Sequence, residues 1–257
     1  MNILLAFKAE PELTMLPEQA WNDAQHGSLD LSYARYQGGA DEQAAAEIVL
    51  RQQATLNLTA LTVGDTHAEP FMRYLNALGF ARLVRIVPPK EAELRFSPQY
   101  IAALLARWVE QHPQSLILIG SQSSEGNNSQ TGFWLAEQLG WPVLAGVVDF
   151  SLDVESEQVE AVLIQNDERL QCRVQLPAVL IVMNDGRYSL RVPGIRQKLA
   201  ASKAEIICAP TEQANTQPDV KLKREQHRRV AQKIEGSCAQ EKAQKLYDQY
   251  LRGQLSR

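Results

Sequence analysis

Apolar runs and amphipathic segments alternate along the first 150 residues. The apolar runs are nearly continuous, which is typical of strands buried on both faces, and they comprise Ile3–Phe7, Leu56–Val63, Ala81–Val87, Leu116–Ile119 and Trp141–Val148. Helices are predicted between them: from Asp41, taken as an N-cap, to Arg51, over Phe71–Leu78, from Ser97-Pro98 to Val109, and from Ser129 to Leu139. This alternation predicts an α/β fold with a doubly wound, mostly parallel sheet.

The pattern changes after residue 148, where short strand-like segments follow one another with only turns between them. Asn166-Asp167 and Asn184-Asp185-Gly186 are the predicted turns. We expect antiparallel strands added to one end of the sheet, formed by Asp149–Asp153, Val159–Leu163, Leu170–Val174 and Val179–Met183.

The last 45 residues differ from the rest in pattern and charge. Residues 213–219 (QANTQPD) are polar and aperiodic and predict a linker, so we expect an α/β nucleotide-binding domain at residues 1–212 and a linker with a C-terminal helical arm at 213–257. A helix face is predicted from Ala239, Ala243, Leu246, Tyr247, Tyr250 and Leu251. From residue 219 onward ten Lys and Arg stand against five Asp and Glu, whereas the first 218 residues carry 16 basic and 25 acidic side chains. A basic tail beside an acidic body suggests that the tail lies on another surface.

Composition excludes several classes of protein. The chain has 257 residues, 45% of them apolar, and a formal net charge of −4, which argues against nucleic acid as the main partner. Neither a signal peptide nor a run of about 18 apolar residues is recognisable, so we expect no membrane insertion. The three cysteines are widely spaced, which favours free thiols in a reducing cytoplasm over disulfides or a zinc site.

The segment from Gly120 to Thr131 (GSQSSEGNNSQT) carries the most suggestive chemistry. It follows a buried strand and precedes a helix, which is where open α/β sheets bind ligands. Free N–H groups at the helix start, with the helix dipole behind them, favour an anion. An ordinary loop that caps its helix through Asn127, Asn128 or Ser129 explains the same residues, and both interpretations stay open at this point.

Catalytic chemistry has little support in the sequence. The histidines are scattered, no serine lies in a G-x-S-x-G elbow, and no metal-ligand cluster is present. Asp41-Glu42 is a candidate acid pair, but a charged helix start explains it better. Lys8 follows the first strand and either reaches a phosphate at the same sheet edge or is simply solvated.

Three blocks of residues resemble the β (small) subunit of electron-transfer flavoproteins over residues 1–206. They are ILLAFK at the start, LILIGSQSSEGNNSQTG followed by LAEQLGWP, and LPAVLIV followed by RY and VPGI. The second block matches without gaps between Gly120 and Thr131, and the likeness is closest to the enterobacterial flavoprotein subunits of that family.

The resemblance implies an adenine-nucleotide α-hydrolase-like fold and an electron-carrier subunit rather than an enzyme. It implies pairing with an α subunit that holds most of an FAD, a structural AMP or a second FAD bound here, and a dehydrogenase as electron donor. The implied cofactor-binding residues are Ala6, Gly38, Gly39, Ala40, Asp41, Val63, Gly64, Gly120, Gln122, Glu125, Gly126, Asn127, Asn128, Ser129, Gln130 and Thr131.

This chain departs from the family pattern at three places. Gly38-Gly39 stand where an asparagine-proline is usual, and only Glu125 remains of an acidic run. The loop between Val182 and Pro193, which in the family docks dehydrogenases through a leucine, is about two residues short, with Leu190 as its only leucine.

Two other functions are compatible with the same residues. One is a stand-alone nucleotide-binding protein of the universal-stress or ATP-pyrophosphatase type, although the S-G-G-x-D-S signature of the pyrophosphatases is absent. The other is a scaffold subunit with an empty nucleotide site.

Overall fold

The computed structural model describes residues 1–23, 31, 34–52, 55–89, 92, 94, 96–123, 127–211 and 233–252. The chain divides into two compact units, Met1–Pro218 and Asp219–Arg257. The expected linker, residues 213–219, lies outside the described residues, and the domain boundary stays a prediction.

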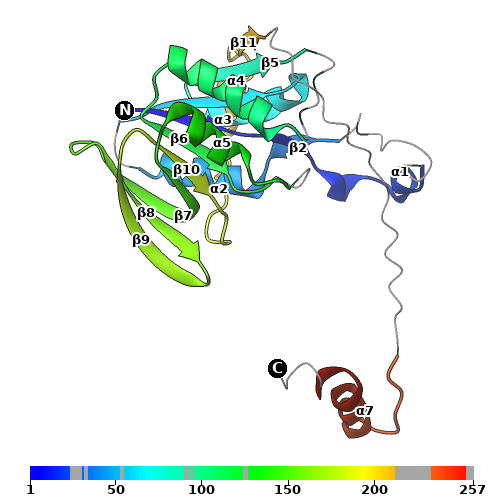
Figure 1. The fold of residues 1–257 in the computed structure, drawn as a ribbon. Helices are drawn as coiled ribbons and strands as arrows, with labels where there is room; N and C mark the ends of the chain where they lie inside the picture. Colours follow the sequence, from blue (N-terminus) through cyan, green and yellow to red (C-terminus); the bar gives the residue numbers. More distant parts are fainter. Residues whose placement is uncertain are drawn as a thin grey trace. The chain divides into compact units, whose positions relative to one another are not determined.

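One large, mostly parallel sheet forms the first unit (Figure 1). Within the described residues it has nine strands in the order β11-β5-β4-β1-β6-β10-β7-β8-β9. In chain order they are β1 (Asn2–Ala6), β4 (Asn57–Val63), β5 (Arg82–Val87), β6 (Leu116–Gly120), β7 (Val143–Asp153), β8 (Gln158–Gln165), β9 (Glu168–Gln175), β10 (Ala178–Val182) and β11 (Ile207–Pro210). All neighbours from β11 to β7 pair parallel, and β7, β8 and β9 pair antiparallel. The predicted mixed α/β class is confirmed.

Helices cover the sheet because its strands are apolar on both faces. Ile3 and Leu5 of β1 belong to a core that includes residues of α2 (Ala40–Leu50) and α3 (Glu69–Leu78). Leu4 and Ala6, which alternate with them, belong to a second core with α4 (Pro98–Gln111) and α5 (Thr131–Leu139). Alternate side chains of a strand point to opposite faces, so the two cores lie on opposite sides of the sheet.

Several short elements were not predicted. They are β2 (Ala9–Pro11) and β3 (Tyr36–Gly38), which pair antiparallel, together with η1 (Leu13–Met15), α1 (Glu18–Asp23), η2 (Thr66–Ala68), α6 (Ile195–Ala201) and β11. Strands of three or four residues are too short to show a hydrophobic period, and α6 exposes most of its apolar side chains.

Two expectations about the end of the sheet were wrong. The segment predicted at Val179–Met183 is β10, which lies between β6 and β7 and pairs parallel with both. The segments predicted as separate strands at Trp141–Val148 and Asp149–Asp153 are one strand, β7, which pairs parallel with β10 at its start and antiparallel with β8 at its end. A register shift near Gly146 accommodates this change of partner.

Two predicted helix starts were misplaced, whereas α4 begins at Pro98 with Ser97 as its N-cap, as predicted. Gly39, not Asp41, is the N-cap of α2, and Asp41 lies in the first helical turn. The helix predicted from Ser129 begins at Thr131, because Asn127 and Ser129 adopt left-handed backbone with φ of 46° and 54°.

The second unit contains the predicted C-terminal helix as α7 (Ala239–Leu246), which continues into η3 (Tyr247–Leu251). Its apolar residues Leu246, Tyr247, Tyr250 and Leu251 are exposed. Within the described parts of both units, none of the helices has the length and hydropathy that a membrane span requires.

Gly146 gives a direct test of the bulge in β7. Its φ is +71°, and a Cβ there would lie 2.7 Å from the carbonyl oxygen of Ile164. We predict that Gly146→Ala lowers the free energy of unfolding by about 2–4 kcal/mol, from left-handed backbone strain plus the clash. Urea denaturation of the parent and the variant measures this loss.

Gly140 is the matched control. Its φ is +64°, but no atom of the described residues beyond its chain neighbours lies within 4 Å of the position that a Cβ would take. Gly140→Ala should therefore cost only the backbone strain, about 1–2 kcal/mol. Equal losses in the two variants would contradict the proposed close approach of β7 to β8.

Candidate functional site

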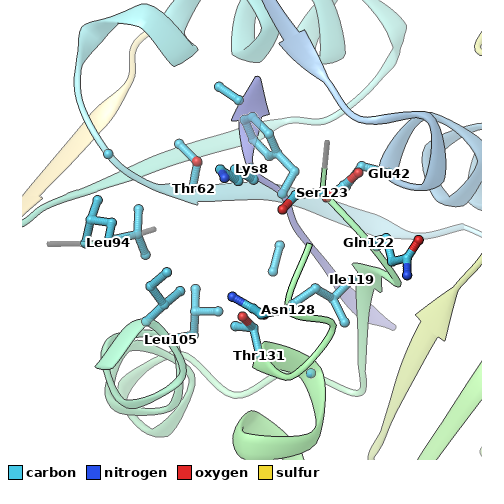
Figure 2. A pocket seen from close by; sticks show the side chains of 18 of the residues that line it. Lys8, Glu42, Thr62, Leu94, Leu105, Ile119, Gln122, Ser123, Asn128 and Thr131 are labelled. Carbon is cyan, nitrogen blue, oxygen red and sulfur yellow. The ribbon is translucent and has the colours of Figure 1, made fainter. Parts of the chain in front are cut away.

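A cavity of about 290 Å³ lies where the carboxyl ends of β1, β4 and β6 meet the start of α5. Parallel strands end at one edge of a sheet, and that edge is the usual ligand site of open α/β folds. Figure 2 shows Leu94 and Leu105 together at one end of this cavity and Glu42 and Ser123 toward the other. The cavity is therefore apolar at one end and polar at the other.

Nine of the sixteen predicted site residues line this cavity: Ala6, Val63, Gly64, Gly120, Gln122, Asn128, Ser129, Gln130 and Thr131. Gly38, Gly39, Ala40, Asp41 and Asn127 are described but are not among its lining residues. Glu125 and Gly126 lie outside the described residues. Lys8, which the sequence left open, is in the lining.

The start of α5 is shaped by its preceding loop. Asn128 Oδ1 accepts a hydrogen bond from the N–H of Gln130 at 3.1 Å, so Asn128 caps that one donor. The first bond of the helix runs from the N–H of Trp134 to the carbonyl of Gln130 at 3.1 Å. The N–H groups of Thr131 and Gly132 precede that bond and have no acceptor within the helix, which gives this edge of the cavity positive character.

Gly132 allows α5 to approach the sheet closely. A Cβ at this position would lie 2.7 Å from Cγ1 of Ile181 in β10 and 3.0 Å from Cγ2 of Ile119 in β6. A larger side chain would push the helix start away from the strand ends, and the N–H groups would move with it.

The turn after β4 is held by a buried arginine. The N–H of Gly64 donates to the carbonyl of Ile86 at 3.0 Å, and Arg85 Nη1 donates to the carbonyl of Gly64 at 3.3 Å. Arg85 is buried and pairs with Glu69 at 3.3 Å. Val63 and Gly64 are thus fixed at the cavity wall by contacts on the side away from the sheet centre.

The two glycines before α2 make room for side chains rather than for a ligand. A Cβ at Gly38 would lie 2.4 Å from the ring of Phe71, and one at Gly39 would lie 2.5 Å from Oε2 of Glu42. Gly120, across from them, is equally restricted, because its Cβ would lie 2.5 Å from Cδ of Glu42. Glu42 therefore fills the space where three segments meet.

Glu42 is the most unusual side chain in the site. It is only 4% exposed, and its Oε2 has no hydrogen-bond partner among the described residues. Burial raises the pKa of this carboxyl from 4.5 to about 8; backbone hydrogen bonds from Glu42 itself and Lys8 oppose the rise, and the carboxylates of Glu10 and Asp41 add to it. Glu42 is consequently protonated at neutral pH.

Several lining residues were missed by sequence reasoning. Leu94, Ile101 and Leu105 form the apolar end, while Tyr36, Glu42 and Thr62 complete the walls. Ile101 and Leu105 have the spacing of ordinary core positions in a helix, and Glu42 has the pattern of a charged helix start, so the sequence offered no signal for these three residues.

Comparison with known proteins shows the family of this chain. The model of the "Electron transfer flavoprotein domain" family matches residues 41–212. The chain belongs to the electron transfer flavoprotein family. The Escherichia coli K12 protein described as "Putative electron transfer flavoprotein subunit YgcR" is 45% identical over 99% of both chains. "Electron transfer flavoprotein subunit beta" of Homo sapiens is 32% identical over 58% of each chain, and that of Chromohalobacter salexigens is 27% identical over 75% of this chain and 73% of its own.

The family membership confirms the resemblance found in the sequence. The matched region contains 20 of the 25 residues that line the cavity, and the other five, Ala6–Ala9 and Tyr36, precede it. It is therefore an electron transfer flavoprotein domain that carries this cavity.

Glu42 should give the protein a characteristic pH dependence. Between pH 4.5 and 8 the folded chain holds a proton that the unfolded chain releases, so the free energy of unfolding falls as pH rises through this window. Glu42→Gln keeps the shape but cannot ionise. We predict that its stability relative to the parent increases steadily from pH 5.5 to 8.5, measured by urea denaturation.

Glu47 of the same helix is the matched control. Burial alone would raise the pKa of Glu47, but hydrogen bonds from Arg191 and Arg51 outweigh it and lower the pKa to about 2. Its titration therefore lies below pH 4.5, and Glu47→Gln should differ from the parent by a constant amount between pH 5.5 and 8.5. A constant difference for Glu42→Gln as well would contradict the neutral buried acid.

Proposed function

We propose that this chain is the β-type subunit of an electron-transfer flavoprotein, an electron carrier rather than an enzyme, with an adenine nucleotide in the cavity beside α5. The observation that carries the proposal is a cavity with an apolar and a polar end at the carboxyl edge of the sheet, in a chain of this family. The other parts of the proposal are a cytoplasmic location and an α subunit that shares an FAD with this chain.

The cavity has the chemistry that AMP requires. Val63, Leu94 and Leu105 offer an apolar slot for a base, and the N–H groups of Thr131 and Gly132 at the start of α5 offer hydrogen-bond donors for a phosphate. A volume of about 290 Å³ is at the small end for ligand pockets, which span roughly 300–1,000 Å³, and supports a mononucleotide over a second FAD.

In this proposal the chain's own residues act by position. The nucleotide fixes the loop after β6, and that loop fixes the edge of the domain that faces the α subunit. FAD, when bound, supplies the electron chemistry by accepting and releasing electrons. The doubly wound classification and the role of α7 and η3 as an arm on the α subunit belong to the same proposal, and the exposed apolar face of that helix supports the arm.

The sequence suggested Leu190 as the residue through which this chain docks a dehydrogenase. Its burial argues against that role. Leu190 is partly buried and packs against the core, whereas Val192, Ile195 and Leu199 are 74%, 78% and 68% exposed. We therefore propose that these three exposed residues, at the end of the loop and on α6, contact the electron-donating dehydrogenase.

The nucleotide content of the complex tests the proposal. The chain co-expressed with an α-type partner should purify as a yellow heterodimer that releases FAD and AMP when denatured, identified by chromatography and mass spectrometry. A colourless monomer that hydrolyses ATP would instead support the stand-alone nucleotide-binding protein, and a yellow heterodimer without AMP would support the scaffold with an empty site.

A variant at Gly64 tests the cavity itself. Gly64 lines the cavity, and no atom of the described residues beyond its chain neighbours lies within 4 Å of the position that a Cβ would take there. Gly64→Phe should therefore fold with a melting temperature close to that of the parent but should release at least about tenfold less AMP, as expected from losing one or two nucleotide contacts. Gly64→Ala, which adds a single methyl group, is the control and should retain most of the AMP.

A further inference from the structure

One carboxylate links the cavity wall to the loop that carries the exposed Val192. Asp41, in the first turn of α2, accepts a hydrogen bond from the N–H of Gln122 through Oδ2 at 3.0 Å. Its other oxygen, Oδ1, accepts from the N–H of Asn184 at 2.8 Å. Gln122 lies in the loop after β6 and lines the cavity, while Asn184 lies near the start of residues 183–194, the loop after β10.

Asn184 secures its own loop to α2 in further ways. Its Nδ2 donates to the carbonyl of Ala40 at 3.2 Å, beside Asp41, and its Oδ1 accepts from the N–H of Gly186 at 2.8 Å. The first residues of the 183–194 loop are thus tied to the start of α2, and the position of α2 relative to Gln122 is set by the same Asp41 side chain.

The far end of the 183–194 loop is also held by α2. Glu47 accepts hydrogen bonds from the N–H of Arg191 at 3.1 Å and from its Nε and Nη2 at 2.9 Å each. Tyr74 of α3 donates to the carbonyl of Arg191 at 3.1 Å. The exposed Val192 follows this clamp directly, so its position depends on contacts at both ends of the loop.

We propose that Asp41 is a positioning residue that couples occupancy of the cavity to the order of the 183–194 loop. This inference rests on the proposed function, because it takes an adenine nucleotide as the occupant. A ligand that orders the loop after β6 favours the state in which the N–H of Gln122 is bound to Asp41. The same carboxylate then holds Asn184, so the 183–194 loop is ordered with it.

The coupling acts in both directions. A partner that orders the 183–194 loop strengthens nucleotide binding by the same factor by which the nucleotide orders the loop, because linkage between two binding events is reciprocal. Occupancy of the cavity would then influence the surface that meets the partner, in addition to stabilising the fold.

Hydrogen exchange on the full chain, with AMP as the probe, tests this coupling. In the parent we expect AMP to slow exchange in peptides covering residues 183–191 by about fivefold or more, within the usual range for coupled sites. In Asp41→Ala, AMP should still slow exchange at residues 127–132 but should leave 183–191 unchanged. Asp41→Asn keeps one acceptor oxygen and should give an intermediate result. Equal protection of 183–191 in the parent and in Asp41→Ala would overturn the proposal.

Asp153 provides the matched control. Its Oδ1 also accepts from two backbone N–H groups, those of Glu155 and Ser156 at 3.1 Å each, but in the turn between β7 and β8. Asp153→Ala should speed exchange in its own turn and leave the effect of AMP on residues 183–191 as in the parent. If Asp153→Ala abolished that effect too, the loss in Asp41→Ala would reflect general destabilisation, and the proposal would fail.

A second experiment needs no ligand, and its outcome separates this proposal from the proposed function. Gly120→Ala displaces Glu42, because the new Cβ would lie 2.5 Å from Cδ of Glu42, and so disturbs the cavity wall. It should speed exchange at residues 183–191 in the parent background and add nothing in the Asp41→Ala background. Equal increases in both would overturn the coupling. If AMP bound nowhere in the parent, the nucleotide assignment would fail, while this double-mutant comparison would still decide the coupling.

Discussion

Parallel pairing of β1 with both β4 and β6 determines where the site can be. Parallel neighbours all end at one edge, and the connections between them must return through helices on the faces of the sheet. The loops after β1, β4 and β6 therefore meet, and α5 begins among them, so that its first residues, Thr131 and Gly132, line the same space. The cavity follows from this topology and from the small residues, Gly120 and Gly132, that let the loop and helix approach.

Helix α2 adds a second constraint through its acidic residues. Asp41 joins two loops, Glu42 fills the space between Gly39 and Gly120, and Glu47 holds Arg191. These carboxyl groups differ in charge state because their surroundings differ: burial, with a smaller contribution from nearby carboxylates, keeps Glu42 neutral, whereas Glu47 is paired with two arginines and is ionised. One helix thereby determines the geometry of the cavity wall and of the neighbouring loop.

Much of the fold could be predicted from the sequence, because continuous apolar runs such as Leu116–Ile119 leave little alternative to a buried strand. The loop from Gly120 to Thr131 could be predicted as a candidate ligand site for the same reason, because it directly follows that strand. The roles of Asp41 and Glu42 could not be predicted. Asp41 binds backbone groups 81 and 143 residues away in the sequence, and the burial of Glu42 depends on Glu10, Gly39 and Gly120 coming together. In the sequence, Asp41 and Glu42 have only the pattern of a charged helix start.

The central claim is that the cavity beside α5 binds a nucleotide through its phosphate. Calorimetric titration of the nucleotide-stripped full chain with AMP, and in parallel with adenosine, tests it most directly. The account predicts one AMP per chain and binding of adenosine weaker by about tenfold or more, because adenosine lacks the charged group that the N–H groups of Thr131 and Gly132 would hold. Equal affinities for the two, or no binding of AMP, would contradict it.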